Sequence, residues 1–302
     1  MRFEELVNEF LFDCEVRELS AKTIDNYRKQ LKCINRFFSE SCGVKNVEDL
    51  KPTHIKQFIS YNQKRGCKPS YTNDLLKVIK VICNYAFSEG YTEDLLTKKV
   101  RNVKEPKVLI HTFTEEEIRK LINHFNGSDF LSIRNKVIFM ILFDTGIRAS
   151  ELMTMKTTQI QENYFIIYGK RRKERVVPKT PLVSKWLLKY LYERDRYFAG
   201  KDAEDYVFLS KNGRQLTCEA LSKFMKKAAV DVGVNPIVRV SPHTCRHTFA
   251  QQQLKNGLDL YSLSRLLGHE SVAITQRYLE ALQDSQILVA AKRTSVLLNL
   301  GR

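Results

Sequence analysis

The chain has 302 residues, of which 43% are hydrophobic, so it can bury a core and divide into two domains, and a disordered chain is excluded. Lys and Arg outnumber Asp and Glu by 50 to 34, and the resulting net charge of +16 favours a polyanionic partner such as nucleic acid. The same excess also fits a solvated surface or a ribosome-associated protein, so the choice between these classes depends on motifs.

The cysteines and the apolar runs bear on the compartment. Seven scattered cysteines, an odd number without any C-x-x-C pair, are atypical of a secreted disulfide framework and favour a reducing cytoplasm. The first 20 residues interleave acidic with apolar side chains, which excludes a signal peptide or a membrane span there. No other stretch approaches 18 uninterrupted apolar residues, so we expect a cytoplasmic protein without a membrane partner.

Helical periodicity fills the first third of the chain. Apolar residues recur at helical spacing in four segments, and these predict a compact four-helix domain over residues 1–95: 2–17, 20–38, 53–64 and 71–90. The next stretch, "LTKKVRNVKEPKVLIHT", is basic, contains Pro106 and lacks a sustained apolar period. It predicts an interdomain linker, which we assign to residues 96–110.

The second domain, residues 111–302, is expected to be α-rich with a small antiparallel sheet. Two short β-branched and aromatic runs flank Gly-Lys-Arg-Arg-Lys-Glu in "NYFIIYGKRRKERVVP", which predicts a β-hairpin with a basic tip over 163–178. Helical signals occur in seven further segments: 114–125, 131–146, 183–198, 217–232, 242–256, 259–267 and 271–283.

The stretch "SPHTCRHTFA" (241–250) gathers two histidines and an arginine at the start of a predicted helix. Ser241 fits an N-cap and Pro242 the first helical position, so His243 and Arg246 lie one turn apart on one face. Free backbone N–H groups at a helix N-terminus, joined by a guanidinium and an imidazole, favour a phosphate pocket.

This stretch also has two other interpretations, a metal site and a structural role. His243 and His247 have the i, i+4 spacing of zinc-binding helices, but Thr244 stands where such helices carry a glutamate, and the permanent cation of Arg246 repels a divalent metal. We therefore expect no metal and no cofactor. The histidines also fit a purely structural role, satisfying hydrogen bonds in the core.

Three other stretches carry candidate residues. "LSRLLGHESVAITQRYLEAL" holds a helix that ends at Gly268, followed by His269, with Tyr278 nine residues beyond that histidine. "DTGIRASEL" places Arg148 directly after a glycine turn, where the alternative is a surface ion pair with Glu151 at i+3. The basic hairpin contributes Lys170 at its tip.

The order of these residues resembles the tyrosine recombinase (phage integrase) family: Arg148, Lys170 in a hairpin, His243-x-x-Arg246, Gly268-His269 and Tyr278. The resemblance covers most of the chain. It implies a mainly α fold, with a four-helix core-binding (SAM-like) domain at residues 1–95 and a catalytic domain with a small antiparallel β-sheet at residues 111–302. The partner implied is a double-stranded DNA recombination site.

The resemblance also implies a role for each residue. Tyr278 is the nucleophile that forms a covalent 3′-phosphotyrosine, without ATP. Tyr261 is the competing tyrosine, which in a different register would lie in the core. Arg148 and Arg246 stabilise the charge on the non-bridging phosphate oxygens. His243 is expected to accept the phenolic proton.

The remaining implied roles concern His269 and the hairpin. His269 corresponds to the family position whose ring hydrogen-bonds the scissile phosphate, and Lys170 to the general acid that protonates the leaving 5′ oxygen, with Lys173 as the alternative. Three arginines nearby are candidates for neutralising DNA phosphates: Arg171, Arg172 and Arg175.

The subtype is a further expectation. The chain begins directly with the core-binding pattern, so it resembles short Xer-type or transposon recombinases without an arm-binding domain. The hairpin "GKRRKER" and the tail after Tyr278 depart from the Xer pattern, which favours an integrase of a mobile element over Xer-type dimer resolution. A non-cleaving DNA-binding regulator and a type IB topoisomerase remain alternatives. The apolar tail predicts a homotetramer formed by tail exchange, with an accessory or partner recombinase as a further partner.

Overall fold

The computed structural model describes residues 1–106, 110–169, 174–276 and 278. The chain forms two compact units, residues 1–108 and 109–302, which are described one at a time. The expected mainly helical fold with one small antiparallel sheet is confirmed. In the part of the chain that the structure describes, no helix combines the length and the apolar character needed to cross a bilayer.

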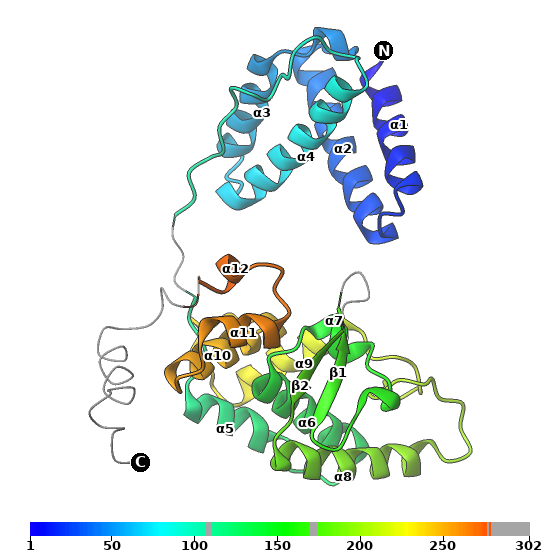
Figure 1. Ribbon diagram of the computed structural model, residues 1–302, viewed down its shortest axis with the longest axis vertical. Coiled ribbons are helices and arrows are strands. Elements are labelled where there is room, and N and C mark those ends of the chain that lie inside the picture. The colour runs from blue at the N-terminus through cyan, green and yellow to red at the C-terminus, as the bar shows by residue number, and fades with distance from the viewer. Residues whose placement is uncertain (107–109, 170–173, 277, 279–302) are drawn as a thin grey trace. The chain divides into compact units, whose positions relative to one another are not determined.

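The first unit is the predicted bundle of four α-helices (Figure 1): α1 (Phe3–Val16), α2 (Ala21–Cys42), α3 (Pro52–Lys64) and α4 (Pro69–Ser88). Helix α2 starts where expected because the Ser20 side chain accepts from the backbone N–H of Thr23, at 3.2 Å. It continues past the predicted residue 38 until Gly43, whose left-handed conformation (φ 68°) ends it. A single apolar core fills the bundle, with Leu31, Ile34 and Phe38 fully buried.

The segment after α4 packs on this first unit. Val100 is buried in the bundle core. Asn73 of α4 exchanges two hydrogen bonds with the backbone of Val103, donating from its side chain to the carbonyl at 2.9 Å and accepting from the N–H at 2.8 Å. The division between the two units therefore falls at residues 108 and 109, within the later part of the predicted linker.

The second unit surrounds α6 (Phe130–Thr145). This helix was predicted to be buried, and residues on every side of it are, including Ile133, Val137, Phe139 and Leu142. Helices α5 (Glu115–His124), α8 (Pro181–Phe198) and α10 (Pro242–Lys255) pack against it. Such burial on all faces makes α6 a fixed support for the residues that follow its C-terminus.

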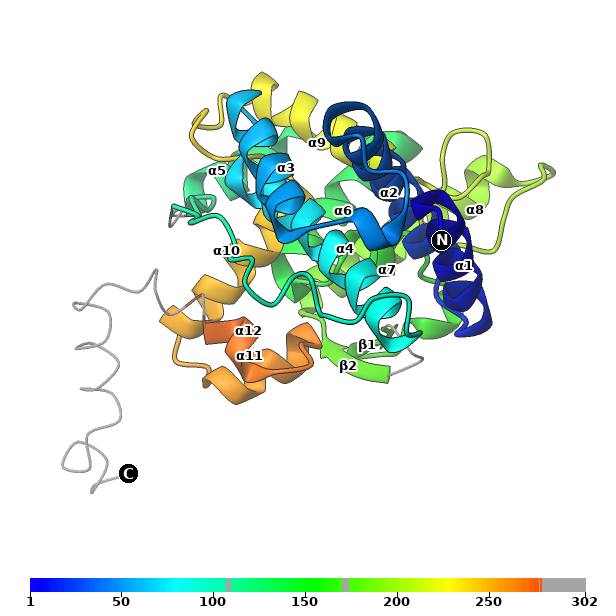
Figure 2. The ribbon, with the colours of Figure 1, turned by 90° about the horizontal axis from the view of Figure 1, so that it is seen from above.

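The sheet of the second unit is a two-stranded antiparallel hairpin. Strand β1 (Tyr164–Tyr168) pairs with β2 (Glu174–Pro178), with Ile166 opposite Val176. Strand β2 lies next to α11 (Leu260–Leu267), and α11 lies beside α10 in both views (Figures 1 and 2). Helix α9 (Cys218–Asp231) also matches its predicted segment.

Several short elements depart from the prediction. Helix α7 (Ala149–Met153) and two 3₁₀ turns, Val47–Asp49 and Thr157–Gln159, were not expected, because such short elements carry too few residues for a periodic signal. Helix α12 (Val272–Gln276) lies within the predicted 271–283, of which residues 277 and 279–283 are outside the described residues. The N–H of Tyr278 donates to the carbonyl of Thr275 at 3.0 Å, an i to i−3 bond of a tight turn.

Candidate active site

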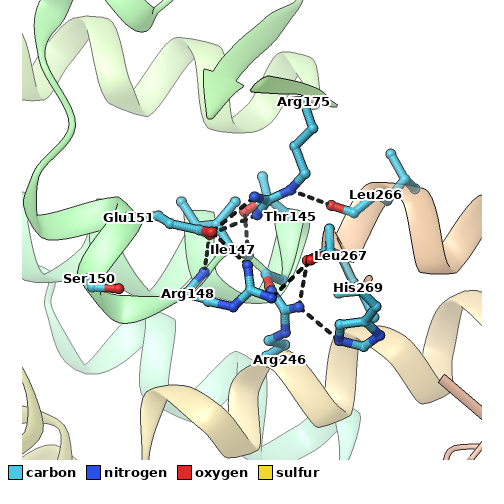
Figure 3. A network of polar contacts seen from close by, with 12 residues as sticks. Thr145, Ile147, Arg148, Ser150, Glu151, Arg175, Arg246, Leu266, Leu267 and His269 are labelled. Atoms are coloured by element: carbon cyan, nitrogen blue, oxygen red, sulfur yellow. Dashed lines mark hydrogen bonds and ion pairs between the residues drawn. The ribbon is translucent and has the colours of Figure 1, made fainter. Parts of the chain in front are cut away.

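Three arginines from three different segments meet at the C-terminus of α11. The Nε of Arg175 donates to the carbonyl of Leu266 at 2.8 Å, Nη2 of Arg246 to that of Leu267 at 2.6 Å, and Nη2 of Arg148 to that of Gly268 at 3.0 Å (Figure 3). The last carbonyls of a helix lack partners within the helix and carry partial negative charge. These three consecutive carbonyls therefore hold three guanidinium groups together.

Arg148 is placed by the end of α6 and the start of α7. Gly146 ends α6 in a left-handed conformation (φ 60°), and Arg148 is the N-cap residue of α7. The ion pair with Glu151 does form, with Nη1 of Arg148 2.7 Å from Oε1. It does not exclude a role at the site, because the same guanidinium bonds Gly268 and its side chain keeps 41% of its surface exposed.

Gly146 is required by more than its backbone angle. A Cβ added at Gly146 would overlap the ring of Phe249, coming within 2.9 Å of its Cγ. The carbonyl of Gly146 also accepts a hydrogen bond from Nη1 of Arg246 at 2.9 Å. The glycine thus lets α10 approach the end of α6 closely enough for Arg246 to reach it.

Arg246 lies deeper than Arg148, with 3% of its surface exposed. Ser241 caps α10 as predicted, accepting from the N–H of Thr244 at 3.1 Å. The guanidinium bonds Gly146 at the end of α6 and Leu267 and His269 at the end of α11, and none of these partners belongs to the α10 N-terminus that the sequence suggested as a phosphate pocket. Burial, and then the charge of Arg148, lower the pKa of Arg246 to about 10, so it remains a cation at neutral pH.

Glu151 and Arg175 are site residues whose joint role was missed. Both carboxylate oxygens of Glu151 accept from Arg175, at 2.9 and 2.7 Å, and the backbone N–H of Arg148 donates to Oε2 at 2.8 Å. Burial would raise the pKa of Glu151, but the hydrogen bonds and charges of Arg175 and Arg148 outweigh it and lower this pKa. The i+3 spacing to Arg148 was the only signal for Glu151 in the sequence.

Arg175 was one of three candidates for neutralising a DNA phosphate, and in the structure its side chain makes internal contacts. Its side chain is 11% exposed and joins Glu151 to the carbonyl of Leu266. A Cβ added at Gly268, which has φ +63°, would lie 3.0 Å from Cδ of Arg175. Gly268 therefore ends α11 and also makes room for this arginine.

Charge at this cluster is unbalanced. The guanidinium groups of Arg148, Arg175 and Arg246 face one carboxylate, that of Glu151, so three positive charges meet one negative charge. An anion between Arg148 and Arg246 would offset both the burial of Arg246 and the repulsion between the two cations. The cluster is therefore suited to bind a phosphate.

The residues after α11 bring His269 and Tyr278 to the same place. Nε2 of His269 lies 3.0 Å from Nη2 of Arg246, and Nδ1 lies 2.8 Å from the hydroxyl of Thr275. The ring of Tyr278 is parallel to that of His269 at 6.3 Å and is only 2% exposed. It packs in a small apolar cluster of α10 and α11 that includes Phe249 and Leu263.

His243 stands at the edge of this group. It is exposed, in the first turn of α10 as predicted, and its ring centroid is 4.3 Å from that of His247. His247 is buried, and its centroid is 5.1 Å from that of Tyr278. His247 was considered only as a metal ligand or core residue, yet it lies between the expected proton acceptor and the expected nucleophile.

The other predicted residues are placed as follows. Lys170, Arg171, Arg172 and Lys173 lie outside the residues that the structure describes. Tyr261 is 64% exposed on α11, so it does not lie in the core. Within the described ranges, no group of three or more His, Cys, Asp and Glu side chains is arranged to hold a metal ion.

Comparisons with known proteins identify the family. The profile of the phage integrase family matches residues 111–284, and that of the phage integrase N-terminal SAM-like domain matches residues 7–90. The chain is 28% identical over 278 residues to tyrosine recombinase XerD of Listeria innocua, an alignment that covers 91% of this chain and 93% of the relative.

Two solved structures share the fold. The Tn1549 transposon integrase in complex with transposon right end DNA aligns with a TM-score of 0.75 at 14% identity, covering 97% of this chain and 99% of that one. The lambda integrase tetramer bound to a Holliday junction aligns with a TM-score of 0.72 at 18% identity, covering 92% and 77%. With the family profile matching well over half of its length, this chain belongs to the phage integrase family and is a tyrosine recombinase.

Proposed function

We propose that this chain cuts and rejoins duplex DNA at a specific site through a bond between Tyr278 and a 3′ phosphate. The observation that carries the proposal is the convergence of Arg148, Arg246 and His269 around an excess of positive charge, with Tyr278 packed beside them. Transesterification keeps the energy of the phosphodiester bond, so no ATP is needed for rejoining.

In this reaction, attack on phosphorus adds negative charge to the non-bridging oxygens. The guanidinium groups of Arg148 and Arg246 are the charge acceptors for it, because a planar guanidinium can hold two oxygens and stays protonated near neutral pH. Arg148, with 41% of its side chain exposed, supplies the accessible edge, and Arg246 supplies a buried cation behind it. His269 donates to the same phosphate from Nε2, as an imidazolium with a proton on both nitrogens.

Proton transfer occurs at the attacking phenol and at the departing 5′ oxygen. The tyrosine phenol, with an ordinary pKa near 10, loses its proton during attack, and His243 accepts it. Lys170, or Lys173 three residues on, protonates the departing 5′ oxygen. Because Tyr278 is 2% exposed, its hydroxyl reaches a duplex only after the ring or its surroundings move.

The covalent intermediate provides the test. The full chain is incubated with sheared DNA from its host, adducts are trapped by denaturation, and the attached DNA is sequenced. We expect adducts at one short sequence, none with Tyr278→Phe, and normal levels with the exposed control Tyr261→Phe. A Tyr278→Phe protein that still forms adducts would place the nucleophile elsewhere, and wild-type protein that binds DNA without adducts would indicate a non-cleaving regulator.

The position of the trapped site separates the biological roles. We propose integration or excision of a mobile element, supported by the departures of the hairpin and the tail from the Xer pattern and by the fold shared with a transposon integrase. Adducts at the ends of an inserted element are then expected. Xer-type dimer resolution is the second candidate, favoured by the alignment with XerD over 93% of its length, and it predicts one chromosomal or plasmid site. Relaxation of supercoiled DNA lacking any such site would indicate a topoisomerase.

The assembly on DNA is also a proposal. We expect four copies on two synapsed sites, held by exchange of the tail, residues 279–302, which lie outside the described residues. The tetramer of lambda integrase on a Holliday junction supports this expectation.

A reducing cytoplasm fits the seven cysteines, all in the described ranges, which form no disulfide. Accessory proteins or a partner recombinase are further expected partners.

A further inference from the structure

Thr275 connects two residues of the proposed site through different atoms. Its hydroxyl lies 2.8 Å from Nδ1 of His269, and its backbone carbonyl accepts from the N–H of Tyr278 at 3.0 Å. The residue is completely buried, although α12 has exposed positions on either side of it at Ile274 and Gln276. One buried residue thus serves both groups: its carbonyl holds the turn of Tyr278, and its hydroxyl contacts the ring of His269.

The hydrogen-bond chemistry fixes which ring nitrogen carries the proton. A guanidinium has only donors, so the 3.0 Å contact between Nη2 of Arg246 and Nε2 of His269 requires Nε2 to accept (Figure 3). A neutral imidazole whose Nε2 accepts carries its hydrogen on Nδ1. That N–H points at the oxygen of Thr275, which has lone pairs to accept it.

We propose that Thr275 is a positioning residue that holds His269 in the Nδ1–H tautomer and orients its Nε2 toward Arg246. The hydroxyl accepts from Nδ1–H whether or not Nε2 also carries a proton. Thr275 therefore holds the ring in one orientation both in the free protein and with a phosphate oxygen at Nε2. The catalytic consequence rests on the proposed function, whereas the tautomer is a property of the free protein.

Two substitutions of Thr275 separate the effect of its hydroxyl from the effect of its packing. Thr275→Val keeps nearly the same shape in the buried site and removes the acceptor for Nδ1–H. Thr275→Ser restores the acceptor and removes only a methyl group. If Thr275 only filled space, the reverse order would be expected, with Thr275→Val behaving more like the wild type than Thr275→Ser.

Nitrogen NMR of the free protein reads the tautomer directly. The full chain is labelled with ¹⁵N-histidine, and the signals of His269 are identified by their loss in His269→Gln. We expect Nδ1 protonated and Nε2 unprotonated in the wild type and in Thr275→Ser at a pH where the ring is neutral. In Thr275→Val the ring has no acceptor at Nδ1 and is free to turn away from Arg246, so we expect the two tautomers to interconvert and give intermediate shifts.

Cleavage of the DNA site found by adduct sequencing is the second measurement. Losing the partner that orients a metal-ligating histidine typically costs about 10- to 100-fold, and by analogy we expect a loss of that size in Thr275→Val, with unchanged DNA affinity and recovery in Thr275→Ser. Thr72→Val is the matched control: Thr72 is equally buried in the first unit, and its hydroxyl bonds the Lys68 carbonyl.

The outcomes distinguish this inference from the proposed function. A wild-type protein with the proton on Nε2, or a Thr275→Val protein with the tautomer unchanged, would overturn the inference. The Nδ1–H tautomer in a protein that forms no covalent adduct would support the inference and contradict the proposed function. Should Thr275→Val not fold, as judged by the fluorescence of the single tryptophan, Trp186 in the second unit, the wild-type and Thr275→Ser spectra still decide it.

Discussion

Arg246 donates hydrogen bonds to three segments at once: the end of α6, the end of α11 and the ring of His269. A lysine in its place has one nitrogen on a flexible chain and cannot reproduce this planar fork. The residue thus combines a charge for the phosphate with the geometry that keeps Gly146, Leu267 and His269 in place.

Arg246→Lys is therefore expected to impair cleavage although the charge is retained. Removing a donor aimed at the transition state typically costs about 3–4 kcal/mol, or roughly 10²- to 10³-fold in rate. The measurement is the rate of covalent adduct formation on a nicked duplex, with DNA affinity measured in parallel. Arg265→Lys, at an exposed position of α11, serves as the control. A lysine variant that cleaves at the wild-type rate would contradict this role.

The buried carboxylate of Glu151 makes the stability of the second unit depend on pH. Its pKa is lowered in the folded protein, so its ion pairs stabilise the fold above the ordinary carboxyl pKa and are lost as the pH falls through the lowered value. Removing one partner of a buried ion pair typically costs about 3–5 kcal/mol. We expect Glu151→Gln to lose about that much unfolding free energy at neutral pH.

The same difference should shrink in acid, where the wild-type carboxylate becomes protonated. Urea unfolding at several pH values, followed by Trp186 fluorescence, reports on the second unit. Glu193→Gln is a control, because Glu193 pairs with Arg196, whose side chain is 67% exposed. A Glu151→Gln deficit that stays constant down to low pH would argue against the ion pairs as its source.

At the scale of elements, the junction between α6 and α7 depends on the contact between Gly146 and Phe249. Gly146 shares its left-handed conformation with Gly233 after α9, where an added Cβ would meet nothing within 4 Å. The two glycines therefore separate the backbone cost of a side chain from its steric cost.

Gly233→Ala should cost about 1 kcal/mol of unfolding free energy, the typical cost of a non-glycine residue in this conformation. Gly146→Ala should cost roughly 1–3 kcal/mol more, because the Phe249 ring must move from a packed core. Urea unfolding followed by Trp186 fluorescence compares the two variants. Equal losses of unfolding free energy in the two variants would show that the Phe249 ring moves aside without an energetic cost.

Patterns of neighbouring residues predicted most helices and both strands. Contacts between segments that are distant in the sequence could not be predicted from such patterns. Ser241 caps its helix as expected, and Ser20 and Thr114 make the same contact, because a cap depends on residues three positions apart. The family order of residues placed Arg148 and Arg246 at one site. The pairing of Glu151 with Arg175 joins residues 24 apart, and nothing local in the chain indicates which acid a buried arginine will meet.

At the scale of the whole molecule, the excess of basic residues bears on binding. Fifty Lys and Arg against 34 Asp and Glu give a protein that is attracted to DNA before any base is read. The three positive charges of the site are a small part of this total. Most of the salt dependence of binding should therefore arise outside the site.

DNA affinity should fall steeply with salt. A protein that neutralises about six phosphates loses about 10³-fold in affinity between roughly 50 and 200 mM salt. Fluorescence anisotropy with a labelled duplex carrying the site measures the slope. Tyr278→Phe should give the same slope, since it changes no charge, and an affinity that does not vary with salt would exclude phosphate contacts as the main source of binding.

The carbonyls of residues 266–268 hold three arginines that come from distant parts of the second unit. A sliding movement of α11 along its own axis would break all three contacts in one event and would carry His269, the next residue, with it. The positions of the three arginines and of His269 are therefore all tied to the position of this one helix end.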